Sequence, residues 1–192
     1  MYKYIFILAV SYISCSHPHY DNPHVIIHTR LGEIEVELFA GKAPRTVAAF
    51  LSNVKAGLYT DGAFYRVLKA EELPTDNNTG IIQGGVWQSA NQKNQNSAGI
   101  AHESTKQSGL SHEDGMISMA RQDTGTARTE FFICIGDQTS FDFGRSANPD
   151  GQGYAAFGKV FRGMNIVKKI QNQRSNGQSF NEKIEIRKIE IL

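Results

Sequence analysis

The sequence predicts a mainly β fold in which antiparallel strands close into a barrel with helices at its ends. Two observations lead to this prediction: many short apolar or alternating runs are separated by turn residues, and only two stretches have helical spacing. Closure suits short antiparallel strands because it leaves no unpaired edge. With 192 residues, 40% of them hydrophobic, the chain has room for one sizeable core and one domain.

The first hairpin is predicted from two runs near the start of the domain. Val25–Thr29 is rich in β-branched residues, and Glu33–Leu38 alternates charged with apolar residues. Because successive side chains of a strand point to opposite faces, Ile34, Val36 and Leu38 share one face. We expect that face to point into the core.

Two helices are predicted, one early and one late in the chain. Pro44 suits a first helical turn, where its missing N–H loses no hydrogen bond, and Gly57 suits the C-terminal end. One buried stripe at helical spacing lies between them: Val47, Phe50, Leu51 and Val54. The second helix is predicted over Met164–Gln171, where Ile166 and Ile170 are one turn apart.

The closing strand, Lys183–Ile191, changes register half-way along. Its isoleucines form two alternating pairs, Ile184 with Ile186 and Ile189 with Ile191. An unbroken strand would turn one pair to solvent. We therefore predict a β-bulge at Arg187–Lys188.

The centre of the chain holds two apolar runs that predict buried strands, Met116–Ala120 and Phe131–Ile135. The polar connector between them is too long for a tight hairpin. Phe131 and Phe132 are adjacent, so they point to opposite faces of their strand. One of them can fill the core while the other lines a surface pocket.

The N-terminal stretch Met1–Cys15 is predicted to be a secretory signal, because Lys3 precedes an apolar run too short to span a bilayer. Cys15 stands where a bacterial lipoprotein carries its acylated cysteine; an uncleaved anchor or a plain signal peptide cut nearby are the alternatives. We expect an exported protein, in the periplasm or on the outer surface, whose only membrane contact is this lipid. Residues 16–23 then form a linker, and 24–192 form the domain.

Composition argues against several other classes of function. A net charge of +1 and the lack of a basic run give no reason to expect nucleic-acid binding. Cys134 is the only other cysteine, so neither a disulfide framework nor a CxxC zinc site is predicted. Hydrolase motifs of the G-x-S-x-G or H-E-x-x-H type are missing. Four N-terminal histidines fit a tether and first strand better than a metal site: His17, His19, His24 and His28.

Three sequence blocks, in order along the chain, resemble the cyclophilin family of peptidyl-prolyl isomerases. The first is AFYRV (63–67) followed by IQGG (82–85), which is similar to the family's F-H-R-V and Q-G-G motifs. The second is GMISMAR (115–121) with TEFFICIG (129–136), similar to G-x-x-S-M-A and S-Q-F-F-I-x, and the third is AAFGKV (155–160), similar to F-G-x-V. The resemblance implies a closed barrel of eight strands capped by two α-helices, a monomer, and no cofactor or metal.

The activity of that family sets clear requirements for a site. The X–Pro bond rotates slowly because its partial double bond gives a barrier of roughly 18–20 kcal/mol. In the twisted state conjugation is lost and the proline nitrogen becomes basic, so a hydrogen bond to it stabilises the transition state more than the planar states. The site therefore needs an apolar slot for the ring and a fixed donor beside the nitrogen.

The resemblance carries these roles onto particular residues. Arg66, the arginine of F-H-R-V, would be the central donor, although an arginine on a strand is more often a solvated surface residue. Gln83 would hold both the substrate backbone and Arg66. The slot would be lined by Phe132, Ile81 and Phe141 with Tyr154 at its rim, each of which could instead be ordinary core. The remaining substrate-binding residues would be Phe64, Ala120, Arg121, Gln122, Thr126 and Glu130.

Three of these predictions specify contacts. The backbone of Ala120–Arg121 would pair with an extended substrate, with Gln122 and Thr126 bordering the next subsite. Glu130 stands where the family often has glutamine, so the network behind Arg66 would use a carboxylate, and a charge-assisted pair would orient the guanidinium.

Two functions follow from this reading. The first is a peptidyl-prolyl isomerase acting on proline-containing peptides and unfolded proteins of the cell envelope. The second is a proline-peptide binding module or chaperone with weak or no turnover, because Leu68–Gly80 is longer than the family minimum. A second insertion, Gly144–Gly153, is predicted to be an ordered surface loop.

Overall fold

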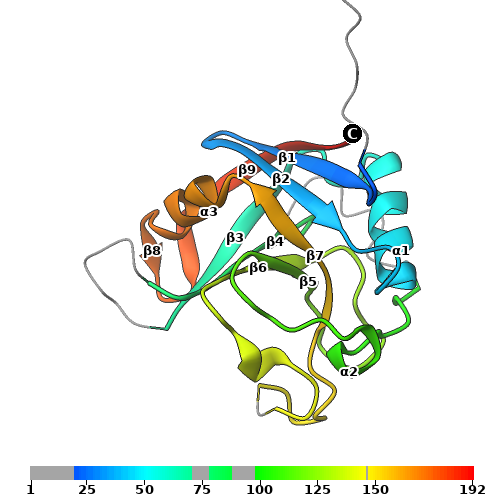
Figure 1. Ribbon diagram of the computed structural model, residues 1–192. Helices are drawn as coiled ribbons and strands as arrows, with labels where there is room; N and C mark the ends of the chain where they lie inside the picture. The colour runs from blue at the N-terminus through cyan, green and yellow to red at the C-terminus, as the bar shows by residue number, and fades with distance from the viewer. Residues whose placement is uncertain (1–19, 71–77, 88–97, 146) are drawn as a thin grey trace, which may run out of the picture.

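The computed structural model describes residues 20–70, 78–87, 98–145 and 147–192, and their strands close into a barrel (Figure 1). The strands are β1 (His24–Thr29), β2 (Gly32–Leu38), β3 (Gly62–Lys69), β4 (Gly80–Gly85), β5 (Met116–Met119), β6 (Phe131–Ile135), β7 (Ala155–Arg162), β8 (Ser175–Asn176) and β9 (Ser179–Ile191). The helices are α1 (Pro44–Lys55), α2 (Thr105–Ser108) and α3 (Met164–Gln171), with a 3-10 turn, η2 (Thr139–Phe141).

The strand order confirms the predicted eight-stranded barrel. Neighbouring strands run β1-β2-β7-β5-β6-β4-β3-β9, all antiparallel, and β9 pairs back onto β1 to close the ring. The short β8 pairs only with β9 and stands outside the ring. The two predicted helices, α1 and α3, lie on opposite sides of the barrel in Figure 1. The single turns α2 and η2 were not predicted, because four residues or fewer carry no helical period.

The core follows the predicted alternation. Ile34, Val36 and Leu38 have no exposed surface, and the α1 stripe is buried except for the partly exposed Leu51. The Phe50 ring contacts the rings of Tyr59, Phe131 and Phe157, with centroids 5.1–5.8 Å apart. These aromatic contacts join α1 to the inside of the barrel.

The predicted bulge in the closing strand is confirmed. Between β1 and β9 the register passes from His28 opposite Lys188 to Thr29 opposite Ile186, so Arg187 has no partner. The extra residue returns the isoleucines on both sides of the slip to the interior, and Ile184, Ile186 and Ile189 are all buried.

A second bulge, at Tyr65 in β3, was not predicted and overturns one site prediction. Phe64 pairs with Gly84, but Arg66 pairs with Gln83, so Tyr65 is the extra residue. Phe64 therefore lies in the barrel core with no exposed surface, while Arg66 is partly exposed. The prediction that Phe64 binds substrate is wrong, because the bulge separates the faces that the two side chains occupy.

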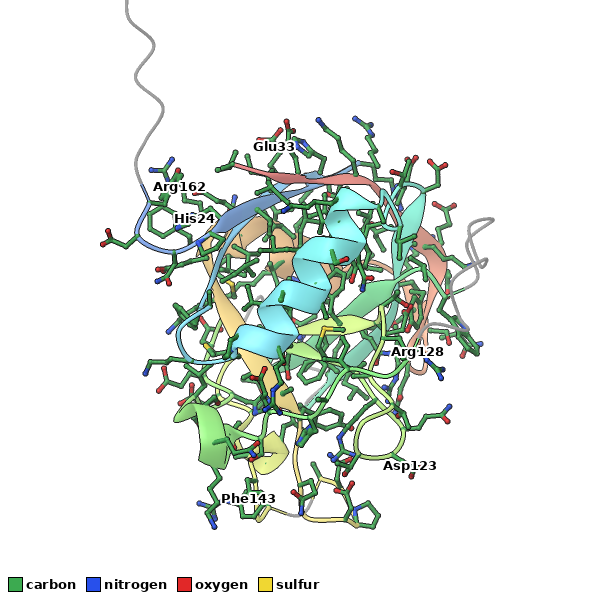
Figure 2. The ribbon with its side chains drawn as sticks, turned by 90° about the vertical axis from the view of Figure 1, so that its right-hand side faces the viewer. His24, Glu33, Asp123, Arg128, Phe143 and Arg162 are labelled. Carbon is green, nitrogen blue, oxygen red and sulfur yellow. The ribbon has the colours of Figure 1, made fainter. Side chains whose placement is uncertain are left out.

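The described chain begins at an aromatic cluster. Tyr20 stacks on His24 at 3.8 Å, and Phe161 meets both rings edge-on. His24 Nδ1 lies 2.8 Å from Glu35 Oε1. Figure 2 places His24 and Arg162 at the end of the molecule opposite Asp123 and Phe143. The chain thus enters the domain far from the loops that carry Asp123 and Phe143.

Several N-terminal predictions lie outside the described residues. They are the signal segment 1–15, lipidation of Cys15, most of the 16–23 linker, and His17 and His19. In the described ranges no helix is long and apolar enough to cross a bilayer. In the same ranges, no three His, Cys, Asp or Glu side chains gather in a way that could hold a metal ion.

Candidate active site

A cavity of about 240 Å³ gathers most of the predicted site residues. It is lined by Arg66, Leu68, Ile81, Gln83, Ala120, Arg121, Phe132, Phe141, Ala147 and Tyr154. Sequence reasoning missed two of these. Leu68 lies two residues after Arg66 on the same strand, so the period of two could have found it, whereas Ala147 lies in a loop and carries no such signal.

The wall of this cavity is aromatic. Phe132 is only 2% exposed, and the rings of Phe141 and Tyr154 meet it edge-on at 5.5 and 5.2 Å between centroids. Phe131, its neighbour in sequence, belongs to the barrel core, so the predicted division of the pair between two faces is confirmed. The result is an apolar slot that an aromatic or proline ring can enter.

Arg66 borders the slot and is held by two amides. Its Nη1 donates to Gln83 Oε1 at 2.8 Å, and its Nε and Nη2 donate to Gln178 Oε1 at 2.9 and 2.7 Å. A guanidinium has five N–H donors, and in the described part of the chain these bonds leave one on each terminal nitrogen. Both partners are neutral, so neither offsets the positive charge.

Gln178 is a residue that sequence reasoning missed. It lies between β8 and β9, and its backbone carbonyl accepts the Val67 N–H at 2.8 Å, which fixes the turn beside β3. The contact joins residues 112 positions apart. Nothing in the turn sequence distinguishes this glutamine from a solvated one.

A hydrogen-bonded chain extends behind Gln83. Gln83 Nε2 donates to the Tyr65 hydroxyl at 2.8 Å, and that hydroxyl donates to Glu130 Oε2 at 2.7 Å. The network behind Arg66 therefore does contain a carboxylate, but the predicted direct pair of Glu130 with Arg66 is wrong, because Tyr65 and Gln83 lie between them. Glu130 does not line the cavity.

Burial and backbone donors define the environment of Glu130. Its Oε1 accepts the N–H groups of Val86 and Trp87 at 2.9 and 3.1 Å and the Thr129 hydroxyl at 3.1 Å. Burial raises the pKa of this carboxyl above its usual range. Gly85 makes the fit possible, because a Cβ there would lie 2.5 Å from Glu130 Oε2.

Arg121 also lines the cavity, but its side chain bonds to residues of loop 144–153 and holds that loop in place. Its side chain is 1% exposed, its Nε and Nη2 donate to the Gly153 carbonyl at 2.9 and 2.6 Å, and its Nη1 pairs with Asp150 at 2.7 Å. The hydrogen bond from Arg121 holds the pKa of the Asp150 carboxyl well below its usual range. These bonds tie loop 144–153 to the cavity wall, where Tyr154 lies 5.4 Å from the guanidinium.

The predicted neighbouring subsite is only partly assembled. The Ala120 N–H already donates to the Glu130 carbonyl at 2.8 Å, so it is not available to a substrate strand. Gln122 and Thr126 do not line the cavity. Thr126 Oγ1 accepts the N–H groups of Gln122 and Asp123 at 3.2 and 3.1 Å and so shapes the connector itself.

A Ser–His–Asp chain lies beneath the cavity. His112 Nδ1 is 2.6 Å from Asp142 Oδ1, and its Nε2 is 3.0 Å from Ser118 Oγ. Ser118 and His112 have no exposed surface, so this serine cannot reach a substrate as a nucleophile. The His112 ring instead stacks under Phe132 at 5.9 Å between centroids and supports the slot. Burial lowers the pKa of the His112 imidazole.

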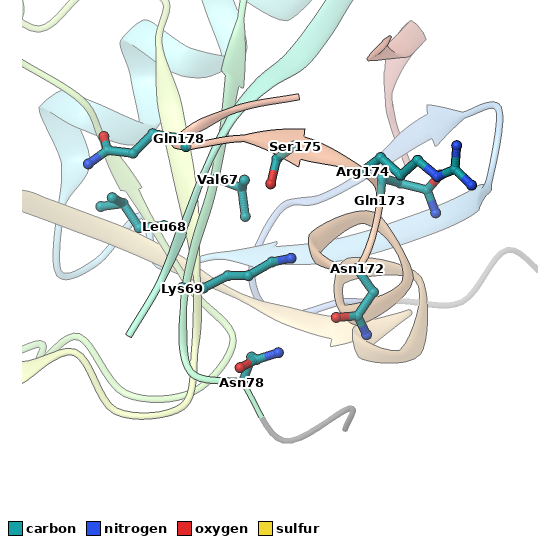
Figure 3. A pocket seen from close by; sticks show the side chains of 10 residues that line it. Val67, Leu68, Lys69, Asn78, Asn172, Gln173, Arg174, Ser175 and Gln178 are labelled. Atoms are coloured by element: carbon teal, nitrogen blue, oxygen red, sulfur yellow. The ribbon is translucent and has the colours of Figure 1, made fainter. Parts of the chain in front are cut away.

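A larger cavity, about 580 Å³, shares Leu68 with the smaller one in its lining (Figure 3). It is lined by Val67, Leu68, Lys69, Asn78, Asn172, Gln173, Arg174, Ser175, Gly177 and Gln178. None of these described residues is aromatic, and only two are apolar. This cavity offers no slot for a proline ring.

Comparison with known proteins now identifies the family. The model of the cyclophilin type peptidyl-prolyl cis-trans isomerase/CLD family matches residues 24–191. The chain belongs to this family. Its fold and its activity class are therefore those of a cyclophilin-type isomerase.

Curated relatives and solved structures agree with this assignment. The chain is similar to a peptidyl-prolyl cis-trans isomerase of Acinetobacter baylyi, 31% identical over 172 residues that cover 89% of this chain and 84% of the relative. It is also similar to peptidyl-prolyl cis-trans isomerase B of Escherichia coli, 32% identical over 148 residues that cover 77% and 83%. A crystal structure of a Cryptosporidium parvum cyclophilin type isomerase shares the fold, with a TM-score of 0.69 at 22% identity over 89% of this chain and 98% of the other.

Proposed function

We propose that this isomerase accelerates rotation about X–Pro bonds in the Arg66 cavity, and that its substrates are exposed proline segments of proteins in the cell envelope. The observation that carries the proposal is the cation at the slot. Among the described residues, Arg66 keeps two N–H donors beyond its contacts with Gln83 and Gln178, and it lines the same cavity as Phe132.

The proposed mechanism is differential binding of the twisted amide. The proline ring packs against Phe132 between Ile81, Phe141 and Tyr154, while a remaining Arg66 N–H donates to the proline nitrogen as it becomes pyramidal. A hydrogen bond from a charged donor contributes about 1.5–3 kcal/mol net, or roughly 10- to 100-fold in rate. No nucleophile is needed, which agrees with the burial of Ser118.

A solved structure of the same fold supports a proline-containing ligand. A related crystal structure, of the Cryptosporidium parvum isomerase, was obtained in the presence of the dipeptide Ala-Pro, and it shares this fold with a TM-score of 0.67. We extend that ligand class to this chain. Since Arg121 fastens loop 144–153 at the cavity wall, we propose that the loop shapes the slot before a peptide binds.

A peptide assay tests the proposal. Exchange between cis and trans NMR peaks of an Ala-Pro peptide should accelerate with the wild-type protein, and Arg66→Ala should lower kcat/KM about 100-fold. Retained peptide affinity without faster exchange would favour the binding-module alternative. A wild-type rate no higher than that of Arg66→Ala would refute catalysis at this site.

The envelope location is a separate part of the proposal. It is supported by the Met1–Cys15 stretch, which has the pattern of a secretory signal with Cys15 at the position of an acylated cysteine. Metabolic labelling with a radioactive fatty acid should mark the wild-type protein expressed in bacteria, and Cys15→Ser should abolish the label. Equal labelling of the two proteins, or recovery of both in the cytoplasm, would contradict it.

A further inference from the structure

Hydrogen bonds link Glu130, Tyr65, Gln83 and Arg66 in series, and each has a fixed donor and acceptor. The groups at the two ends, Glu130 and Arg66, determine which atoms donate. A side-chain amide can present either its oxygen or its NH2 group to a neighbour. Arg66 can only donate, so the bond to Arg66 requires the oxygen of Gln83 to face it. The NH2 group of Gln83 then faces Tyr65, and an acceptor held there reinforces the orientation.

Glu130 does this through Tyr65. An ionised carboxylate only accepts hydrogen bonds, so the Tyr65 hydroxyl must donate its one proton to Glu130 Oε2. The Tyr65 oxygen is then left as an acceptor, and it takes the Gln83 NH2 group at 2.8 Å. Gln83 consequently turns its oxygen to Arg66.

We propose that Glu130 is a positioning residue for isomerisation, which fixes the orientation of the Gln83 amide, and through it the Arg66 guanidinium, by committing the Tyr65 hydroxyl proton. This inference rests on the proposed function of the Arg66 cavity. Glu130 itself touches neither the cavity nor a substrate there.

The backbone around Glu130 makes the effect of a glutamine predictable. Oε1 of Glu130 accepts from the N–H groups of Val86 and Trp87, so in Glu130→Gln the amide oxygen stays there and the NH2 group faces Tyr65. Tyr65 then accepts from residue 130, and the Gln83 oxygen becomes the one acceptor within this hydrogen-bonded series that can take the Tyr65 proton. This reverses the Gln83 amide and brings its NH2 group against the donors of Arg66, which is repulsive.

The reversal gives a test by double mutation. Glu130→Gln should lower kcat about tenfold with KM changed less than twofold, since a charge-assisted bond to Arg66 is lost. Tyr65→Phe removes the hydroxyl that links Glu130 to Gln83 but does not reverse the Gln83 amide, so it should lower kcat only about threefold. The double variant should be as active as Tyr65→Phe, so the second change rescues the first.

Tyr59→Phe is the matched control. Tyr59 is 1% exposed, and burial raises the pKa of its hydroxyl, with a smaller contribution from the charge of Glu130, but this hydroxyl makes none of the hydrogen bonds between Glu130 and Arg66. This variant should keep wild-type kcat. The four variants are first compared with the wild type by thermal unfolding, so that a loss of folded protein is separated from a loss of turnover.

A pH profile gives a second readout. Protonating Glu130 should act like the glutamine, so wild-type kcat should fall as pH drops towards the pKa of Glu130, which burial raises above its usual range. The titratable groups near this carboxyl are Tyr59, before β3, and Tyr65, with Arg66 next along the strand. The Tyr65→Phe profile should lack this fall.

The outcomes separate the two proposals. If the wild-type protein does not accelerate exchange, the proposed function fails. If it does, but Glu130→Gln is as active as wild type, or the double variant is less active than Glu130→Gln, the positioning role is overturned. Because Tyr65 and Glu130 are in contact, losses of stability need not add in the double variant. A merely structural role would therefore be recognised by kcat following the thermal unfolding midpoint, whereas the positioning role predicts rescue of kcat without a matching recovery of stability.

Discussion

The two cavities that share Leu68 differ in the chemistry that they offer. The larger one, about 580 Å³, is lined mainly by amides, hydroxyls and the cations Lys69 and Arg174. The smaller one, about 240 Å³, combines three aromatic rings with Arg66 of strand β3, whose guanidinium is oriented by the amides of Gln83 and Gln178. Volume does not identify the site. A reaction that needs an apolar slot and one fixed donor requires the smaller cavity.

The sharpest test of this comparison exchanges cations on strand β3. Arg66→Lys keeps the charge but loses the planar fork that the two glutamines hold, so we expect kcat/KM to fall roughly 100-fold. Lys69→Arg, three residues along and lining the other cavity, should stay within about twofold of wild type in the same peptide assay. A comparable loss of kcat/KM in the two variants would show that the cation of the smaller cavity has no special role.

The aromatic wall is the next element to remove. Phe141→Ala takes away a partly exposed ring that meets Phe132 at 5.5 Å, and we expect KM to rise about tenfold with a smaller change in kcat. Phe143→Ala is the matched control, because that ring lies two residues on and contacts Lys106 rather than the cavity. Titration of an Ala-Pro peptide measures both. An unchanged KM in Phe141→Ala would remove this ring from the slot.

Gln178 belongs to both sides of the comparison, since it lines the larger cavity and binds Arg66. Its contact is exposed, so Gln178→Ala should lower kcat only about threefold. Gln173→Ala, which lines the larger cavity without a bond to Arg66, should leave kcat unchanged. If Gln173→Ala lowers kcat as much as Gln178→Ala does, the larger cavity also contributes to turnover.

The smallest effect concerns stability and pH beneath the small cavity. Burial lowers the pKa of His112, so between the lowered value and about 6.5 the unfolded chain binds a proton that the folded chain does not. Stability from this group is present above about pH 6.5 and is lost as pH falls. Urea unfolding at pH 7.5 and 5.5 should show the decline, weakened in His112→Gln and retained in His28→Gln. An equal decline in His112→Gln would rule out this origin.

Local patterns were enough for much of the fold and for part of the site. Alternation placed Ile34, Val36 and Leu38 inside, and the slip in the isoleucine pattern located the bulge at Arg187, because each is a statement about neighbours along one strand. The motif likeness placed Arg66 and Phe132, and the structure brings them to one cavity.

The rest depended on contacts between segments distant in sequence. The bulge at Tyr65 places Phe64 in the core and leaves Arg66 partly exposed, and it shifts the register of β3 against both β4 and β9, which are distant in sequence from one another. Glu130 reaches Arg66 only through Tyr65 and Gln83, a path that no spacing encodes.

By itself the sequence predicted the eight strands of the barrel, the two capping helices, the resemblance to the family and Arg66 as the central cation of the proposed site. Only the tertiary structure decided which groups hold that cation and which of two cavities it serves. The physical reason is range: side-chain alternation and helical spacing act between near neighbours along the chain, whereas Gln178 meets Arg66 across 112 residues, once the barrel has closed.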